Sequence, residues 1–384
     1  MSGLAVKTEN KACMRNVSIE VLRVVAMMLI IFQHFIEYGG IKEGVIIGEL
    51  MYPFLVYLYG IVQIAVNCYV MISGYFLVTS KFKFSKLIAL WIEVVFYSLF
   101  LYLLMAALGY YDFSIVTILS CFVPTLTGRY WFFTIYVGLY LLSPFLNVAI
   151  NAMSKSQMFK LIVMLLALFS LWTTLPFFSG MNVNGGWSIA WFIVLYFVAA
   201  YLRLHYIPNY KIKNKLLALI LLSFILPASK VIIDIFEKNG FPLFNGYSTM
   251  FYKYDSIFVV ALTICVFVIF INIRINPKGF GNLILKISPC TFGVYLIHHH
   301  AKVYPVMWSL IDGARYLDDW FFPVYMTIVV LAIFSVCIAV DKARELLFRG
   351  LVKSSLLRHV SQFIEKSALK CVGVLRLIAY KINQ

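Results

Sequence analysis

Hydrophobic residues fall in ten long runs along the chain, and most polar residues lie between these runs. Each run has about 20 residues, which is the length that an α-helix needs to cross the hydrocarbon core of a bilayer. Proline and glycine mark several of the breaks, as at Pro208 and Pro277. We therefore predict an all-α, polytopic membrane bundle of about ten transmembrane helices. The predicted spans are residues 18–38, 53–79, 87–109, 130–151, 159–177, 187–206, 215–236, 252–273, 289–310 and 321–341.

The composition supports a membrane protein. The 384 residues are 63% hydrophobic and 12% charged, whereas soluble domains carry about 25% charged residues. A surface with so few charges would not stay dissolved in water, so we expect the lipid bilayer to be the solvent of this chain. The net charge of +16 does not indicate a nucleic-acid partner, because in a membrane protein its distribution matters more than its sum. The seven cysteines are scattered singly, which predicts neither a disulfide framework nor a zinc site.

The distribution of charge predicts the orientation. Lysine and arginine concentrate before the first run, in every second loop and after the last run, while acidic residues favour the other loops. By the positive-inside rule both termini are cytoplasmic, in agreement with an even number of helices. We expect residues 1–17 to be a cytoplasmic segment, residues 18–344 the transmembrane domain and residues 345–384 a basic, amphipathic cytoplasmic tail. This tail suits a helix lying on anionic lipid, although a tail that only fixes the orientation is the alternative.

The first run carries a stripe of polar side chains, namely Glu20, Arg23, His34 and Glu37. Arg23 and His34 are eleven residues apart, so they differ by about 20° around the helix axis and by about 16 Å along it. A charged group in lipid costs a few kcal/mol, so the stripe is expected to face the protein interior or a wet cavity. With the N-terminus inside, Arg23 lies near the cytoplasmic face and His34 lies beyond the midplane. The alternatives are a snorkelling Arg23 and a His34 that only bonds a neighbouring helix.

Three consecutive histidines, His298, His299 and His300, lie in the ninth run. Successive helical residues point 100° apart, so at most two of the three can face one cavity. His298 is close to the middle of the predicted span and is the best candidate for an interior position. One stretch of chain cannot surround a metal ion tetrahedrally, so we expect no metal. Trp187, at the expected outer mouth of the sixth run, suits either a carbohydrate platform or an interfacial aromatic belt.

Several segments of the chain carry recognisable patterns. In the string NVSIEVLRVVAMMLIIFQH (16–34) a basic residue is followed, after ten others, by histidine, and this resembles the opening helix of the membrane-bound acyltransferase 3 family. The stretch with Lys81, Lys83 and Lys86 resembles its basic cytoplasmic loop. Further segments match other signatures in the family's order over roughly residues 14–345: MISGYFL (71–77), YWFFTIYVGLYLLSPFLN (130–147), GGWSIAWFIVLYFVAAYLR (185–203) and TFGVYLIHH (291–299).

The resemblance implies a function. Members of this family take an acyl group, usually acetyl from acetyl-CoA, and place it on a sugar hydroxyl of an exported or surface glycan. His34 then corresponds to the essential histidine and Arg23 to its basic partner. We accordingly expect an O-acyltransferase of the bacterial inner membrane, with acetyl-CoA as co-substrate and a glycan or lipid-linked sugar as acceptor. Because acyl-CoA is anionic and cytoplasmic, its phosphates are expected at the basic inner face, on Arg23, Lys81, Lys83 and Lys86.

The acceptor is expected to approach from the outer side or at mid-bundle, and His298, Trp187 and Trp131 are the candidate contacts. A neutral His34 could take the proton of the acceptor hydroxyl, an effect worth about 10²–10⁴-fold in rate, with Glu37 orienting its ring. An acyl-imidazole intermediate on His34 is equally compatible with the sequence. Two other functions stay open at this point: a glycan transporter that transfers no acyl group, and a membrane sensor or structural subunit.

Overall fold

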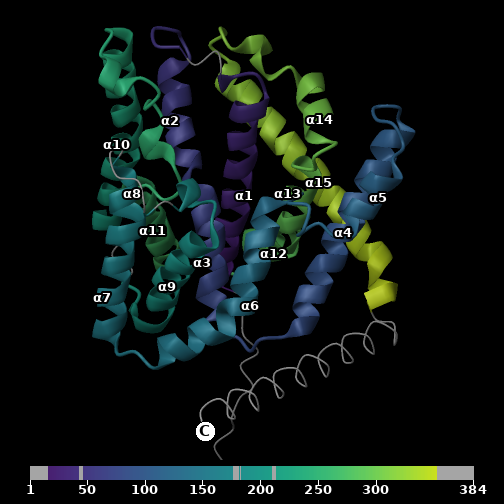
Figure 1. Ribbon diagram of the computed structural model, residues 1–384, viewed down its shortest axis with the longest axis horizontal. Coiled ribbons are helices and arrows are strands. Elements are labelled where there is room, and N and C mark those ends of the chain that lie inside the picture. The colour runs from purple at the N-terminus through teal and green to yellow at the C-terminus, as the bar shows by residue number, and fades with distance from the viewer. Residues whose placement is uncertain (1–15, 43–45, 176–180, 182, 210–212, 353–384) are drawn as a thin grey trace, which may run out of the picture.

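The computed structural model describes residues 16–42, 46–175, 181, 183–209 and 213–352, and this part of the chain contains helices and no strand. Within it, nine helical spans are long and apolar enough to cross a membrane, and helix α9 adds a shorter apolar span of 17 residues. All ten predicted runs contain helix, which confirms the predicted all-α membrane bundle. Figure 1 shows these helices standing roughly side by side.

The helices have the following bounds: α1 Val17–Tyr38, α2 Tyr52–Val62, α3 Ile64–Leu77, α4 Phe84–Ala107, α5 Ile115–Cys121, α6 Trp131–Asn151, α7 Lys155–Leu166, α8 Trp172–Thr174, α9 Ile189–His205, α10 Lys213–Lys238, α11 Ile257–Asn272, α12 Phe280–Ile287, α13 Thr291–His298, α14 Tyr304–Ile311 and α15 Phe322–Val352. Three pairs of these helices each form a single span. Helices α2 and α3 form the span Tyr52–Leu77, α7 and α8 are joined by a π-helical turn, and α12 and α13 are joined by a 3-10 turn.

Two predicted boundaries were wrong. The ninth span covers Phe280–His298 instead of residues 289–310, and α14 is a separate short helix. The helix stops at His298 because His299 leaves helical geometry, with φ −105° and ψ 14°, and Pro305 begins the next helix. The last helix continues to Val352, past the predicted end of the tenth span at residue 341. The rest of the predicted tail, residues 353–384, and most of the N-terminal segment, residues 1–15, lie outside the described residues.

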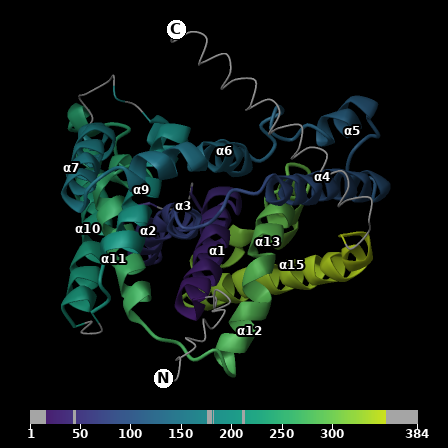
Figure 2. The same ribbon diagram turned by 90° about the horizontal axis from the view of Figure 1, so that it is seen from below.

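Helix α1 lies at the centre of the bundle. It packs against α2, α3, α11, α12, α13 and α15, and seen from below it stands among these helices while α7 and α10 lie toward the periphery (Figure 2). In its most apolar window 67% of the residues are buried, and 78% in the α2–α3 span, compared with 22–28% in α4, the α7–α8 span, α10 and α15. The polar stripe of α1 is therefore on a helix that other helices surround.

Local sequence fixes both ends of α1. At its start the Asn16 side chain accepts hydrogen bonds from the backbone N–H groups of Ser18 and Ile19, which would otherwise have no partner. At its end the N–H of Gly39 bonds the carbonyl of Phe35 at 2.9 Å, and a Cβ at position 39 would meet that same oxygen. A glycine is thus required where the chain turns out of the helix.

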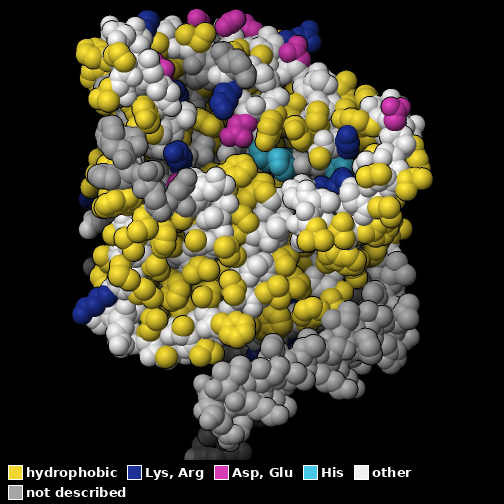
Figure 3. Space-filling model, viewed as in Figure 1, with side chains coloured by type: hydrophobic (Ala, Val, Ile, Leu, Met, Phe, Trp, Pro, Cys, Tyr) yellow, Lys and Arg dark blue, Asp and Glu magenta, His cyan; other side chains and the backbone are white. Residues whose placement is uncertain are grey.

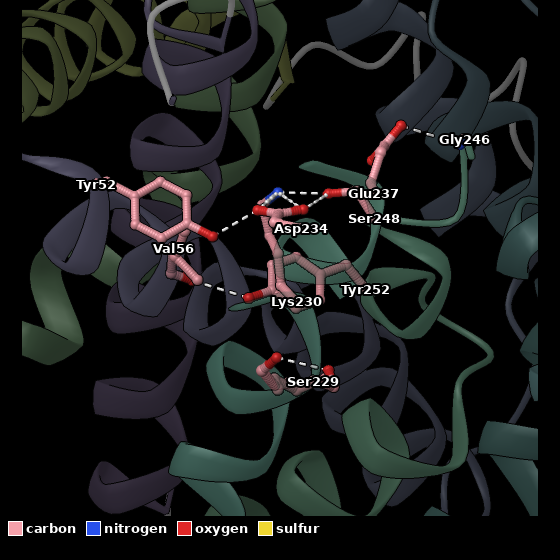
Figure 4. A network of polar contacts seen from close by, with 10 residues as sticks. Tyr52, Val56, Ser229, Lys230, Asp234, Glu237, Gly246, Ser248 and Tyr252 are labelled. Carbon is pink, nitrogen blue, oxygen red and sulfur yellow. Dashed lines mark hydrogen bonds and ion pairs between the residues drawn. The ribbon is translucent and has the colours of Figure 1, made fainter. Parts of the chain in front are cut away.

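A buried polar network holds the loop after α10 against α2 (Figure 4). Lys230 Nζ lies 2.8 Å from Asp234 Oδ2 and 2.5 Å from the Ser248 hydroxyl, while the Tyr52 hydroxyl donates to Asp234 at 2.5 Å. Lys230 is only 8% exposed, so its charge depends on these partners. The network ties residues 248–254 to the α1 side of the bundle, where they reach the site described next.

Candidate active site

His34, in the last quarter of α1, is hydrogen-bonded to His298, the last residue of α13. The distance from His34 Nδ1 to His298 Nε2 is 3.0 Å, and the distance from His298 Nδ1 to the carbonyl oxygen of Val294 is 2.6 Å. His298 is 1% exposed, whereas His34 is partly exposed. The bundle therefore joins two histidines that are 264 positions apart in the sequence.

These hydrogen bonds determine which nitrogen of each histidine ring carries the hydrogen. A carbonyl oxygen only accepts, so Nδ1 of His298 must carry the hydrogen, and in a neutral ring Nε2 is then an acceptor. Nδ1 of His34 consequently donates to His298. The lone pair of His34 stays on Nε2, to which no described residue is hydrogen-bonded. The arrangement resembles the way a carboxylate orients the histidine of a serine-protease triad, with a neutral imidazole in place of the carboxylate.

The other two histidines of the triple make different contacts. The His299 ring stacks on His34 with its centroid 4.4 Å away, and the His300 ring bonds the carbonyl oxygen of Ser98 at 3.3 Å. Burial lowers the pKa of His299 and the pKa of His300 to about 4, so both rings are neutral at pH 7. Two of the three rings, His298 and His299, therefore contact His34 and the third does not, in keeping with the limit set by helix geometry.

The cavity beside His34 has a volume of about 110 Å³ and is lined by His299 but not by His298. His298, predicted as a substrate contact at mid-span, thus lies behind His34 at the end of its helix. Residues beyond a helix end do not follow the 100° period, so the sequence could not single out His299. Figure 3 shows histidine side chains at the floor of a hollow in one face of the molecule.

An aromatic stack forms another wall of this cavity. The rings of Trp131 and Trp187 are stacked, with centroids 4.4 Å apart and 12° between their planes. Tyr254 lies nearly parallel to both, and its hydroxyl accepts a hydrogen bond of 2.8 Å from Gln33, the neighbour of His34. The structure therefore brings both predicted tryptophans to the cavity, together with Tyr254 and Gln33, which no pattern in the sequence singled out.

Glu37 does not orient His34 as predicted. Its Oε1 accepts hydrogen bonds from Gln33 at 3.2 Å and from the Tyr59 hydroxyl at 3.4 Å, and no described contact joins it to the His34 ring. One helical turn separates the two side chains on α1, which places the carboxylate beside the ring and above it. Glu37 does line the His34 cavity, so it is positioned toward a ligand instead of toward the histidine.

Arg23 lines a second cavity, of about 250 Å³, nearer the start of α1. Its Nε donates to Glu20 Oε2 at 3.1 Å, and its two Nη groups have no hydrogen-bonding partner among the described residues. A guanidinium with free N–H groups in a cavity is suited to an anionic ligand. The side chains of Tyr69, Phe132 and Phe292 line both this cavity and the His34 cavity, so the two are neighbours separated by three aromatic rings.

The predicted lysines lie outside both cavities. Lys81, Lys83 and Lys86 are exposed around the start of α4, and the backbone of Lys83 is held by the Tyr140 hydroxyl. Leu90, one turn after Lys86 on α4, lines the Arg23 cavity. The lysines therefore lie along the chain before a residue of that cavity and do not form its wall. In the described part of the chain, no group of three or more His, Cys, Asp or Glu side chains could hold a metal ion.

The fold and the site together define a class of protein: a multi-pass helical membrane protein whose reactive groups lie inside the bundle, with an oriented histidine on one side and an arginine on the other. Residues 16–342 match the model of the acyltransferase domain of the acyltransferase 3 family. The match covers well over half of the chain, so the chain belongs to this family of membrane acyltransferases. The predicted family is confirmed. No curated protein and no solved structure matches the chain in the corresponding comparisons.

Proposed function

We propose that the protein is an O-acyltransferase of the bacterial inner membrane, which moves an acetyl or similar short acyl group from acyl-CoA to a sugar hydroxyl of a surface or lipid-linked glycan. The observation that carries this proposal is the series of hydrogen bonds that links the Val294 carbonyl to His298 and His298 to His34. It leaves an unprotonated Nε2 on His34 at the wall of a cavity that is also lined by stacked tryptophans.

In the proposed reaction, Nε2 of His34 takes the proton of the acceptor hydroxyl while the acceptor oxygen attacks the thioester carbonyl carbon. The His34 imidazolium keeps its Nδ1–H bond to His298 and is stabilised by it. When the tetrahedral intermediate collapses, the carbon–sulfur bond breaks and the thiolate of CoA takes the proton back from Nε2. A base in this position accounts for about 10²–10⁴-fold of the rate.

The donor is proposed to enter through the Arg23 cavity, with both termini of the chain on the cytoplasmic side. Arg23 presents two free Nη groups to the anionic part of acyl-CoA, and Lys81, Lys83 and Lys86 raise the local concentration of the anion near the entrance. The thioester end then points past Tyr69, Phe132 and Phe292 toward His34. The acceptor sugar is proposed to stack on Trp131 and Trp187 from the other side.

The test is transfer of label from acetyl-CoA to surface glycan by membranes that contain the wild type or a variant at matched expression. We expect His34→Ala to lower the rate about 10²–10⁴-fold and Arg23→Ala to raise the KM for acetyl-CoA. Arg203→Ala is the matched control, because Arg203 contacts Tyr75 and lines neither cavity. If His34→Ala transfers label as fast as the wild type, or the wild type transfers none, the enzyme proposal is refuted.

A further inference from the structure

Two more cavities adjoin the His34 cavity at the far end of α1. The first, which we call arm A, has a volume of about 390 Å³ and shares Gln33, Glu37, Trp187 and Tyr254 with the His34 cavity. The second, arm B, has a volume of about 550 Å³ and shares Glu37 and Tyr38 with it. Glu37 lines all three cavities, so the two arms meet beside the catalytic histidine.

The arms leave the site on opposite sides of His34. Viewed along α1, Gln33 and Glu37 lie about 100° and 60° to one side of His34, while Tyr38 lies about 40° to the other side. Arm A extends from the first side toward α2 and the loop residues 249–254, and arm B extends from the second side toward α14 and the turn after it. The His34 cavity therefore lies between two cavities that share wall residues with it and lead toward different elements.

Both arms have the lining expected for a polyhydroxylated ligand, with aromatic surface and scattered hydrogen-bonding groups. In arm A the parallel rings of Trp187 and Tyr254 lie 6.2 Å apart, beside the side chains of Asn184, Thr249 and Lys253. Arm B offers Tyr304, Trp308, Ser309 and Asp312. Each arm alone lies in the range of about 300–1,000 Å³ that is typical of pockets for drug-sized ligands, which is more room than one sugar residue at His34 needs.

We infer that the acceptor is an oligomeric or polymeric glycan that lies across both arms, so that acylation takes place on an internal sugar residue. The residue that is acylated rests against Trp131 and Trp187 with its hydroxyl at Nε2 of His34, and its two neighbours in the chain occupy arms A and B. A site for a single sugar or a chain end needs space on one side of the histidine only. This inference rests on the proposed function and specifies the class of its acceptor.

The experiment locates the label within the product. Membranes with the full-length protein are given isotope-labelled acetyl-CoA and purified surface polysaccharide of the expressing cells. The polysaccharide is then partly depolymerised and sequenced by tandem mass spectrometry. We expect the label on internal residues. Thr249→Trp in arm A and Ser309→Trp in arm B, both at exposed positions, should each lower labelling about tenfold, which corresponds to about 1.4 kcal/mol of lost binding.

Thr327→Trp is the matched control, because Thr327 is exposed on α15 and lines none of these cavities. Label confined to chain ends or to single lipid-linked sugars would overturn the inference, and so would full labelling by either arm variant. The position of the label in the wild-type product decides the question even if a tryptophan variant folds poorly. No label in any fraction from the wild type would instead refute the proposed acyl transfer itself.

Discussion

Replacing His298 by phenylalanine removes the acceptor to which Nδ1 of His34 donates, and leaves the cavity wall unchanged because His298 does not line the cavity. A hydrogen bond to a charged group contributes about 1.5–3 kcal/mol, and the His34 ring is charged after it has taken the proton. Each 1.36 kcal/mol of lost transition-state stabilisation lowers the rate tenfold, so loss of this hydrogen bond should lower kcat roughly 10- to 150-fold. The KM values of donor and acceptor should change little.

His298→Gln should lose less than His298→Phe, since an amide oxygen can again accept from Nδ1 of His34. The assay is the labelled transfer described above, run at several concentrations of each substrate so that kcat and KM are separated. His300→Phe is the matched control: this ring is equally buried and two residues away, but it bonds Ser98 instead of His34. It should stay within about threefold of the wild type in kcat, as expected for loss of one neutral hydrogen bond outside the site.

A His298→Phe enzyme with the kcat of the wild type would refute the tautomer argument, because it would mean that His34 needs no partner on Nδ1. Equal losses in His298→Phe and His300→Phe would refute it as well, since they would indicate a general disturbance of this segment. A large rise in the KM of the acceptor with unchanged kcat would instead place His298 in contact with substrate, as the sequence alone had predicted.

Three further predictions concern stability and binding. Lys230→Met should destabilise the fold by roughly 3 kcal/mol, because the partly buried carboxylate of Asp234 is left without its cation. Thermal unfolding should show that adding Asp234→Leu recovers part of the loss. Gly186→Ala should raise the KM of the acceptor and cost about 1–3 kcal/mol, since φ is +92° and a Cβ would lie 2.6 Å from that of Tyr254; binding and melting curves would check this. Burial lowers the pKa of His299 in the folded state to about 4, below the ordinary 6.5. Between these two pH values the unfolded protein binds about one proton more than the folded protein, so the free energy of unfolding should fall as the pH drops from 6.5 to 4. His299→Gln should remove this contribution to the pH dependence of stability.

Helix periodicity was sufficient to predict the polar stripe of α1. The stripe depends only on the 100° step between residues, and in the structure its members line cavities inside the bundle. The apolar runs likewise predicted the bundle, because a bilayer demands long apolar helices wherever it is crossed. Positions in one helix are thus readable from sequence.

Contacts between helices could not be predicted from the sequence in the same way. His298 orients His34 because α13 packs against α1, and no spacing in the sequence encodes which helices become neighbours. Glu37 was the nearest acidic residue in the sequence and was predicted as the partner, although its carboxylate bonds Gln33 and Tyr59. Tyr254 reaches the site from a loop whose position depends on the network around Lys230, which links segments almost 200 residues apart in the chain.

The three aromatic rings that line both the His34 cavity and the Arg23 cavity also have an electrical consequence. Polar cavities that reach toward opposite ends of one helix would, if continuous, let ions leak through the membrane. Each elementary charge that crosses a potential of 100 mV releases about 2.3 kcal/mol, so such a leak would drain the energy that the cell stores across this membrane. Tyr69, Phe132 and Phe292 line both cavities and so lie where the two adjoin. Apolar aromatic rings at this level would oppose the passage of a hydrated ion more strongly than that of a small neutral group, which is what a membrane that holds a potential requires of such a site.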